Sequence, residues 1–147
     1  MDLEELVARE QIRDLVARYN STADSARFDE TLALFAPDAV MDTDGELHEG
    51  HAGIRALFEG ARDSLAAHAD DVPKYLRHLT ATLQIDVLGP TTARGRCYYQ
   101  VILPHGLDHW GRYIDEYGLI DGRWLFTRRK EHLDGYVEGG WAASTVG

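Results

Sequence analysis

Cysteine is almost absent from this chain, with Cys97 as its single representative in 147 residues. One thiol cannot form an intrachain disulfide framework, and its place inside an apolar run indicates a small core residue rather than a nucleophile. Long hydrophobic runs are missing too, since no window approaches the ~18 apolar residues of a membrane span. The N-terminus, Met1-Asp2-Leu3-Glu4-Glu5, is acidic and lacks the apolar stretch of a signal peptide. These absences predict a cytoplasmic protein without membrane contact.

Positive charge is also scarce. The chain has 15 Lys and Arg against 25 Asp and Glu, which gives a formal net charge of −10. Phosphate recognition needs clustered Lys and Arg, so the sequence excludes a nucleic-acid or anionic-membrane surface. A glycine-rich phosphate loop is missing, because Gly139-Gly140 has no predicted helix after it. We therefore predict no nucleotide cofactor.

The order of predicted elements is helices first and long strands after them, in one domain over residues 1–147. Helical periodicity covers 3–23, 28–35 and 52–68, and Pro37 is expected to end the second helix. A short strand pair, 39–41 and 46–48, flanks the Asp44-Gly45 turn. The remaining predicted strands are 78–87, 92–103, 109–119 and 124–130, with a hairpin turn at Asp121-Gly122.

This order indicates an α+β fold in which a curved antiparallel or mixed sheet wraps around the N-terminal helices. Such a sheet makes a cone, and its open end suits a small hydrophobic ligand. The strand over 78–87 alternates strictly. One face would carry Leu79, Ala81, Leu83, Ile85 and Val87, and the other His78, Thr80, Thr82, Gln84 and Asp86. The apolar stripe suits either the core or the interface of an expected homo-oligomer, a dimer or trimer.

Three segments carry a family resemblance. They are Tyr19-Asn20-Ser21-Thr22-Ala23-Asp24, Leu76-Arg77-His78-Leu79-Thr80, and the final hairpin from Gly111-Arg112-Tyr113 to Trp124-Leu125-Phe126-Thr127-Arg128-Arg129. Together they resemble the SnoaL-like domain of the NTF2-like superfamily, in particular its scytalone dehydratase and hexachlorocyclohexane dehydrochlorinase type. The resemblance runs from about residue 3 to residue 135. It implies a cystatin-like α+β barrel.

The resemblance also implies roles for three residues. In that type an Asp at the end of the first helix orients a His on the sheet, which acts as the base; Asp24 and His78 stand at these positions. The dehydrochlorinase has an arginine five residues after the tryptophan of its last strand, and Arg129 matches it. It has a lysine where this chain has Tyr19, which weakens the case for dehydrochlorination itself. The superfamily also contains isomerases, cyclases and non-catalytic transport factors.

Read from the residues alone, each candidate has a second interpretation. His78 can exchange a proton near neutral pH or can be a structural histidine. Asp24 can stabilise its imidazolium or can cap the next helix. Arg129 can bind a developing oxyanion or can form a surface or interface salt bridge.

Aromatic side chains are expected to wall the substrate pocket or the core: Tyr19, Tyr98, Trp110 and Tyr113. His105 and His109 flank Gly106 in a predicted loop rather than on a helix that would align both imidazoles, so no metal site is predicted. We expect a cofactor-independent dehydratase-type lyase, or a related isomerase or cyclase. Its substrate would be a small hydrophobic molecule that contains a carbonyl or is polyketide-like. The alternative is a non-catalytic module for ligand binding or protein assembly.

Overall fold

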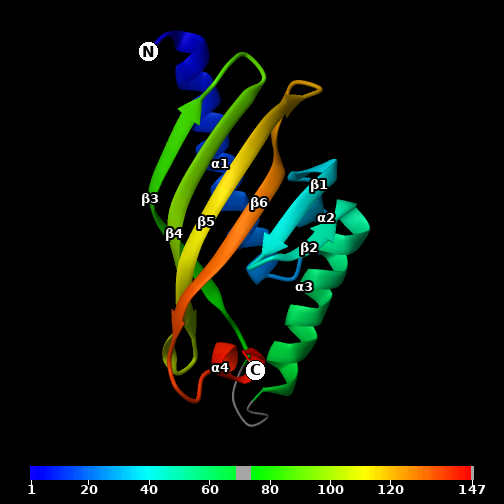
Figure 1. Ribbon diagram of the computed structural model, residues 1–147, viewed down its shortest axis with the longest axis vertical. Helices are drawn as coiled ribbons and strands as arrows, with labels where there is room; N and C mark the ends of the chain where they lie inside the picture. The colour runs from blue at the N-terminus through cyan, green and yellow to red at the C-terminus, as the bar shows by residue number, and fades with distance from the viewer. Residues whose placement is uncertain (69–73, 147) are drawn as a thin grey trace.

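The computed structural model describes residues 1–68 and 74–146, and its centre is one curved six-stranded sheet (Figure 1). The helices are α1 (Leu3–Asp24), α2 (Phe28–Leu32), α3 (Gly50–Ala67) and α4 (Trp141–Thr145). The strands are β1 (Phe35–Thr43), β2 (Glu46–Glu49), β3 (Arg77–Val87), β4 (Thr92–Leu103), β5 (Gly106–Ile120) and β6 (Arg123–Tyr136). The predicted α+β class is confirmed.

The sheet is mixed and open. Its strand order is β2-β1-β6-β5-β4-β3, and only the β1–β6 pair is parallel. Figure 1 shows α1 crossing behind the long strands and α3 beside β1 and β2. The interior of the cone therefore lies between the sheet and these two helices.

Helix α1 begins at a side-chain cap, because Asp2 accepts a hydrogen bond from the backbone N–H of Glu5 at 2.8 Å. Apolar residues at helical spacing along its middle and end are buried: Ile12, Leu15, Val16 and Tyr19. Leu3, Leu6 and Val7 continue the same spacing toward the N-terminus but are exposed. No helix in residues 1–68 and 74–146 is both long enough and apolar enough to cross a bilayer.

Two predictions about helices are wrong: where the second helix stops, and that no helix follows Gly139-Gly140. The second helix stops at Leu32 rather than Phe35, and Pro37 lies inside β1. The β1–β6 register shifts between Phe35 and Val40, and such an irregularity tolerates a residue without an N–H. A short helix, α4, also follows Gly139-Gly140. Its first N–H groups are held by a distant aspartate, which no local pattern reveals.

A bulge interrupts β3 and changes which face its residues occupy. The β3–β4 register shifts between Ala81 and Gln84, and Thr82 has a φ of 57°. The predicted strict alternation is therefore wrong: His78 and Ile85 both face the interior, whereas Leu79 is 51% exposed on the outer face. The apolar stripe is divided between core and surface. An oligomer interface at this strand stays a prediction.

Candidate active site

Asp24 and His78 meet where the end of α1 packs on the start of β3. The Asp24 carboxylate accepts twice from the same residue: Oδ2 lies 2.8 Å from the backbone N of His78, and Oδ1 lies 2.6 Å from its Nδ1. The two side chains are mostly buried, at 8% and 17% exposure. Asp24 does not cap α2, whose N-terminus has no side-chain cap. The structure therefore brings these two candidate site residues together.

This contact fixes the state of the imidazole. A ring whose Nδ1–H donates to a carboxylate has Nε2 as its free acceptor, and the carboxylate stabilises the imidazolium formed when Nε2 takes a proton. The backbone contact holds the strand against the helix, so the ring cannot drift from its partner. The pair is thus arranged for proton transfer.

Tyrosine rings form the interior wall beside His78. Tyr99 lies 6.1 Å from the His78 ring and stacks on Tyr113 at 4.6 Å, measured between centroids. Tyr113 in turn meets Tyr19 edge-on at 6.0 Å. Burial raises the pKa of all three phenols above the ordinary value, so they are neutral hydrogen-bond donors rather than bases. Tyr99 is a residue that the sequence reasoning missed.

Arg129 is fully buried and belongs to an ion pair inside the core. Its Nε and Nη2 bind the two carboxylate oxygens of Asp115 at 2.8 and 2.9 Å. The guanidinium also lies 3.8 Å from the Tyr113 ring centroid and 4.3 Å from that of Tyr19. Burial opposes its charge, but Asp115 outweighs this and holds the pKa of Arg129 well above its ordinary value.

The position of Arg129 differs from both sequence interpretations. It is not a surface salt bridge, because neither it nor Asp115 is exposed. It does not contact the imidazole either: the stacked pair Tyr113 and Tyr99 stands between Arg129 and His78. Its role in the chemistry stays a prediction.

A second histidine, His109, lies near His78. It was not predicted as a site residue, because it was set aside with the predicted loop at His105 and His109. His109 is on β5, 7% exposed, and its Nδ1 lies 2.7 Å from Oδ2 of Asp108. Its ring centroid is 6.5 Å from that of His78 and 6.1 Å from that of Tyr99. The pair His109–Asp108 repeats the contact of His78 with Asp24. The strand that carries His109 begins at Gly106, earlier than predicted, so the Asp108-His109 dipeptide was the signal in the sequence.

Glu131 also reaches the interior, from β6. Its Oε1 accepts a hydrogen bond from the hydroxyl of Tyr99 at 3.2 Å. Tyr99 fits here because Gly111 faces it, and a Cβ on Gly111 would come within 2.7 Å of the tyrosine oxygen. Among the described residues, no group of three His, Cys, Asp or Glu is placed to hold a metal ion.

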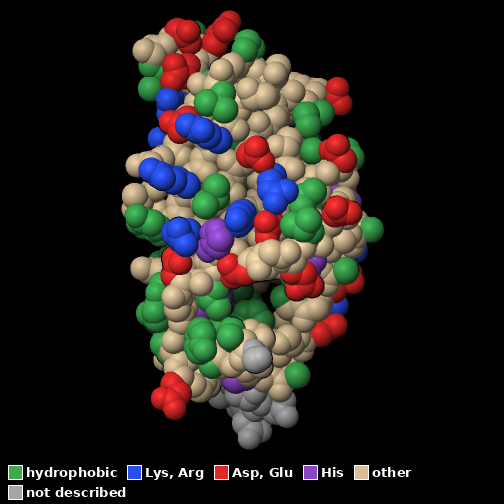
Figure 2. All heavy atoms as spheres, in the orientation of Figure 1, with side chains coloured by type: hydrophobic (Ala, Val, Ile, Leu, Met, Phe, Trp, Pro, Cys, Tyr) green, Lys and Arg blue, Asp and Glu red, His purple; other side chains and the backbone are tan. Residues whose placement is uncertain are grey.

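The surface is hollowed at the open end of the cone. Figure 2 shows an opening bounded by β2, α3 and α4, with hydrophobic side chains in its depth. Trp141 closes part of this end, because its ring packs 5.9 Å from His109 and its Nε1 donates to Ser64 Oγ of α3 at 3.1 Å.

Comparison with known proteins places the chain in a family. The model of the SnoaL-like domain matches residues 4–130. The chain belongs to the SnoaL-like family. A comparison with curated proteins finds no significant match to this SnoaL-like protein.

Solved structures share its fold. An NTF2-like protein with a cystatin-like fold from Novosphingobium aromaticivorans is 26% identical, with a TM-score of 0.74 and coverage of 97% of this chain and 96% of that one. A candidate scytalone dehydratase from the same organism is 21% identical, with a TM-score of 0.76 and 95% coverage of both chains. The hexachlorocyclohexane dehydrochlorinase of Novosphingobium barchaimii is 18% identical, with a TM-score of 0.77 and 93% coverage of both.

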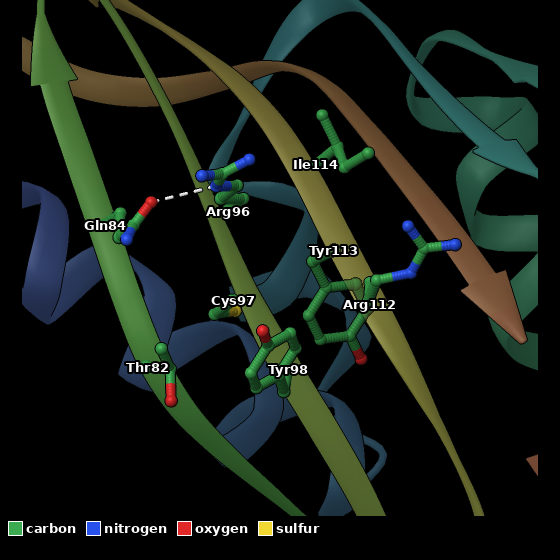
Figure 3. Close-up of a pocket in the computed structure, with 8 residues that line it drawn as sticks. All are labelled: Thr82, Gln84, Arg96, Cys97, Tyr98, Arg112, Tyr113 and Ile114. Carbon is green, nitrogen blue, oxygen red and sulfur yellow. Dashed lines mark hydrogen bonds between the residues drawn. The ribbon is translucent and has the colours of Figure 1, made fainter. Parts of the chain in front are cut away.

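Two aromatic residues of this SnoaL-like protein do not lie where the sequence reasoning expected them. Tyr98 is 56% exposed on the outer face of the sheet, where it borders a shallow hollow of about 270 Å³ (Figure 3). Trp110 alternates with the inward His109, so it leaves the sheet on the outer face and packs over Gly135. Neither residue faces the His78–Asp24 pair. Strand parity explains both errors, because adjacent residues cannot share a face.

Proposed function

We propose that this SnoaL-like protein is a cofactor-independent lyase of the dehydratase type, or a related isomerase or cyclase. Its substrate would be a small hydrophobic molecule with a carbonyl group. The observation that carries the proposal is the pair of hydrogen bonds that Asp24 accepts from the backbone N–H and Nδ1 of His78, which leaves Nε2 of the imidazole free beside a wall of aromatic rings. The opening in Figure 2, with hydrophobic side chains in its depth, supports access of such a substrate to an apolar interior.

The chemistry follows from the bound imidazole. His78 Nε2 takes a proton from the carbon next to the carbonyl, and the electron pair of that C–H bond passes into an enolate. Asp24 stabilises the imidazolium that results. The imidazolium then returns its proton to a hydroxyl on the next carbon, the C–O bond breaks, and water leaves as the C=C bond forms. General acid–base catalysis of this kind contributes roughly 10²- to 10⁴-fold.

Charge on the carbonyl oxygen also needs a partner. The neutral phenol of Tyr99 is beside His78, whereas Arg129 lies behind two rings, so the geometry favours a tyrosine for this task. Tyr99 already donates to Glu131 at 3.2 Å, a distance long enough for the hydroxyl to turn toward a better acceptor.

The proposal is tested without knowing the natural substrate. The purified protein is incubated in D₂O with small cyclic ketones such as cyclohexanone and 2-tetralone, and loss of the proton next to the carbonyl is followed by NMR. We expect exchange above the buffer rate in the wild type and none above it in His78→Ala. Tyr98→Phe, on the outer face, is the matched control and should exchange normally.

The His78→Ala variant is expected to fold. The backbone N–H of residue 78 still donates to Asp24 whatever side chain it carries, so the strand stays anchored. Asp24→Asn should exchange more slowly, because an amide does not stabilise the imidazolium. Equal exchange rates in the wild type and in folded His78→Ala would remove the catalytic proposal. Ketone binding that survives in His78→Ala without exchange in either protein would favour the ligand-binding module.

A further inference from the structure

The two histidines of the interior form a matched pair of dyads. Each ring uses Nδ1 to bind one aspartate, at 2.6 Å for His78 and 2.7 Å for His109. The ring centroids are 6.5 Å apart and the planes stand at 88°, so the imidazoles meet edge to face without bonding to each other. In the described part of the chain no hydrogen bond reaches either Nε2.

Both free nitrogens keep some accessible surface. Among the described residues, the fully buried side-chain nitrogen and oxygen atoms that lack a partner are Asn20 Oδ1 and Arg129 Nη1. Neither Nε2 is among them, so each nitrogen is unpaired without being fully enclosed.

Asp108 fixes the tautomer of His109. This carboxylate is fully buried and accepts three hydrogen bonds, from His109 Nδ1 at 2.7 Å, Trp141 N at 2.7 Å and Ala142 N at 3.0 Å. Nε2 of His105 also lies 3.0 Å from its Oδ1. Burial opposes its charge, but these hydrogen bonds hold the pKa of Asp108 below its ordinary value. An anion that is so fully engaged makes His109 keep its proton on Nδ1 and present Nε2 as an acceptor.

The surroundings of His109 keep that ring neutral. Burial lowers its pKa, the Asp108 charge raises it in part, and a proton on His78 lowers it further. The other groups that face it are Tyr99, Glu131 and the ring of Trp141, and His105 lies on the opposite oxygen of Asp108. When His78 carries the transferred proton, His109 is therefore the acceptor of the pair and not a second acid.

We propose that His109 is a substrate-binding residue that selects a hydroxyl as the leaving group, so that the site eliminates water rather than halide. This rests on the proposed function of His78. The leaving hydroxyl donates its hydrogen to Nε2 of His109, which turns an oxygen lone pair toward the His78 imidazolium. His78 then protonates that oxygen, the C–O bond breaks, and the water formed keeps its hydrogen bond to His109. A halide cannot donate, so it would leave a desolvated acceptor without a partner.

Binding tests the proposal independently of turnover. Three probes are titrated into the His78→Ala variant, which cannot eliminate water, labelled at its histidine rings and followed by NMR: 3-hydroxycyclohexanone, 3-chlorocyclohexanone and cyclohexanone. We expect the hydroxy ketone to bind about tenfold or more tightly than the other two and to shift the His109 signals. Adding His109→Phe to this variant keeps a ring of similar shape without the acceptor, and the protein should then bind all three alike. Adding His105→Phe instead removes the more exposed histidine on Asp108 and should keep the preference.

Two outcomes would overturn the inference. One is equal binding of the hydroxy and chloro ketones to His78→Ala, and the other is an unchanged preference when His109→Phe is added to that variant and the protein is folded. Exchange of cyclohexanone in D₂O separates this inference from the proposed function. His105→Phe should keep that exchange, whereas His78→Ala should lose it. Exchange in the wild type without any preference for the hydroxy ketone would contradict the selector role and leave the proposed function standing.

Discussion

The Arg129–Asp115 pair allows a quantitative test of what holds the interior together. Both side chains are fully buried, and Tyr117 adds a hydrogen bond to Asp115 at 2.9 Å. Arg129→Met removes two charge-assisted bonds and leaves a carboxylate in the core with that one donor. Breaking a buried pair in this way costs about 3–5 kcal/mol. A domain of this kind has roughly 5–15 kcal/mol of unfolding free energy, so the loss is large but measurable.

The matched variant is the double substitution Arg129→Met with Asp115→Asn. The amide introduced by Asp115→Asn carries no charge, and its oxygen can still accept a hydrogen bond from the hydroxyl of Tyr117. We expect it to recover about 2 kcal/mol or more of the loss, since neighbours in one network couple by 0.5–3 kcal/mol. Urea unfolding of the wild type, both single variants and the double variant gives the full cycle.

Two results would refute this reasoning. A cost below about 1 kcal/mol for Arg129→Met would mean that the pair is not desolvated as the structure has it. A double variant no more stable than Arg129→Met would mean that the unpaired Asp115 carboxylate is not the cause of the lost stability. The same double variant also tests the catalytic role that the family resemblance implies for Arg129. If it is folded but no longer exchanges ketone protons, the arginine takes part in the chemistry.

Two further predictions concern single groups. Burial lowers the pKa of His109, so the unfolded chain binds this proton more readily. Its effect on unfolding free energy is absent above pH ~6.5 and appears as a loss when the pH falls below that value, by at most about 1.4 kcal/mol per pH unit. Urea unfolding at pH 5.5 and 7.5 should show a smaller pH difference in His109→Phe, and an unchanged difference would contradict the assignment. Burial raises the pKa of the Cys97 thiol to about 11, so it should not react with a thiol reagent at pH 7.5 in the folded protein; prompt labelling without denaturant would show that the site is open.

Periodicity and residue chemistry were enough to predict the α+β class and the strand over 92–103. The meeting of Asp24 with His78 was expected only from the family resemblance, because the residues alone left a structural histidine and a helix cap open for these two positions. The β1–β6 pairing was beyond such reasoning. It depends on a parallel contact between residues far apart in sequence, and Pro37 made the segment look like a helix end.

One error near the site arises where strand parity fails. The bulge at Thr82 places a threonine at positive φ, which its residue type disfavours, so alternation carried from His78 to Ile85 predicts opposite faces. The choice between Tyr98 and Tyr99 has another cause: β4 alternates regularly at these residues, and Tyr98 was assigned to the wrong one of its two faces. Asp108 could not be recognised from sequence because its donors at Trp141 and Ala142 belong to helix α4, which is distant in sequence.

The contact between Asp24 and the main chain of His78 has a consequence for redesign. One oxygen of the carboxylate holds the peptide group and the other holds the ring, so anchoring and reactivity are separable at this position. A lysine, glutamate or unnatural base introduced at residue 78 would inherit the same backbone attachment. The reactive side chain at residue 78 could therefore be replaced while β3 keeps its register.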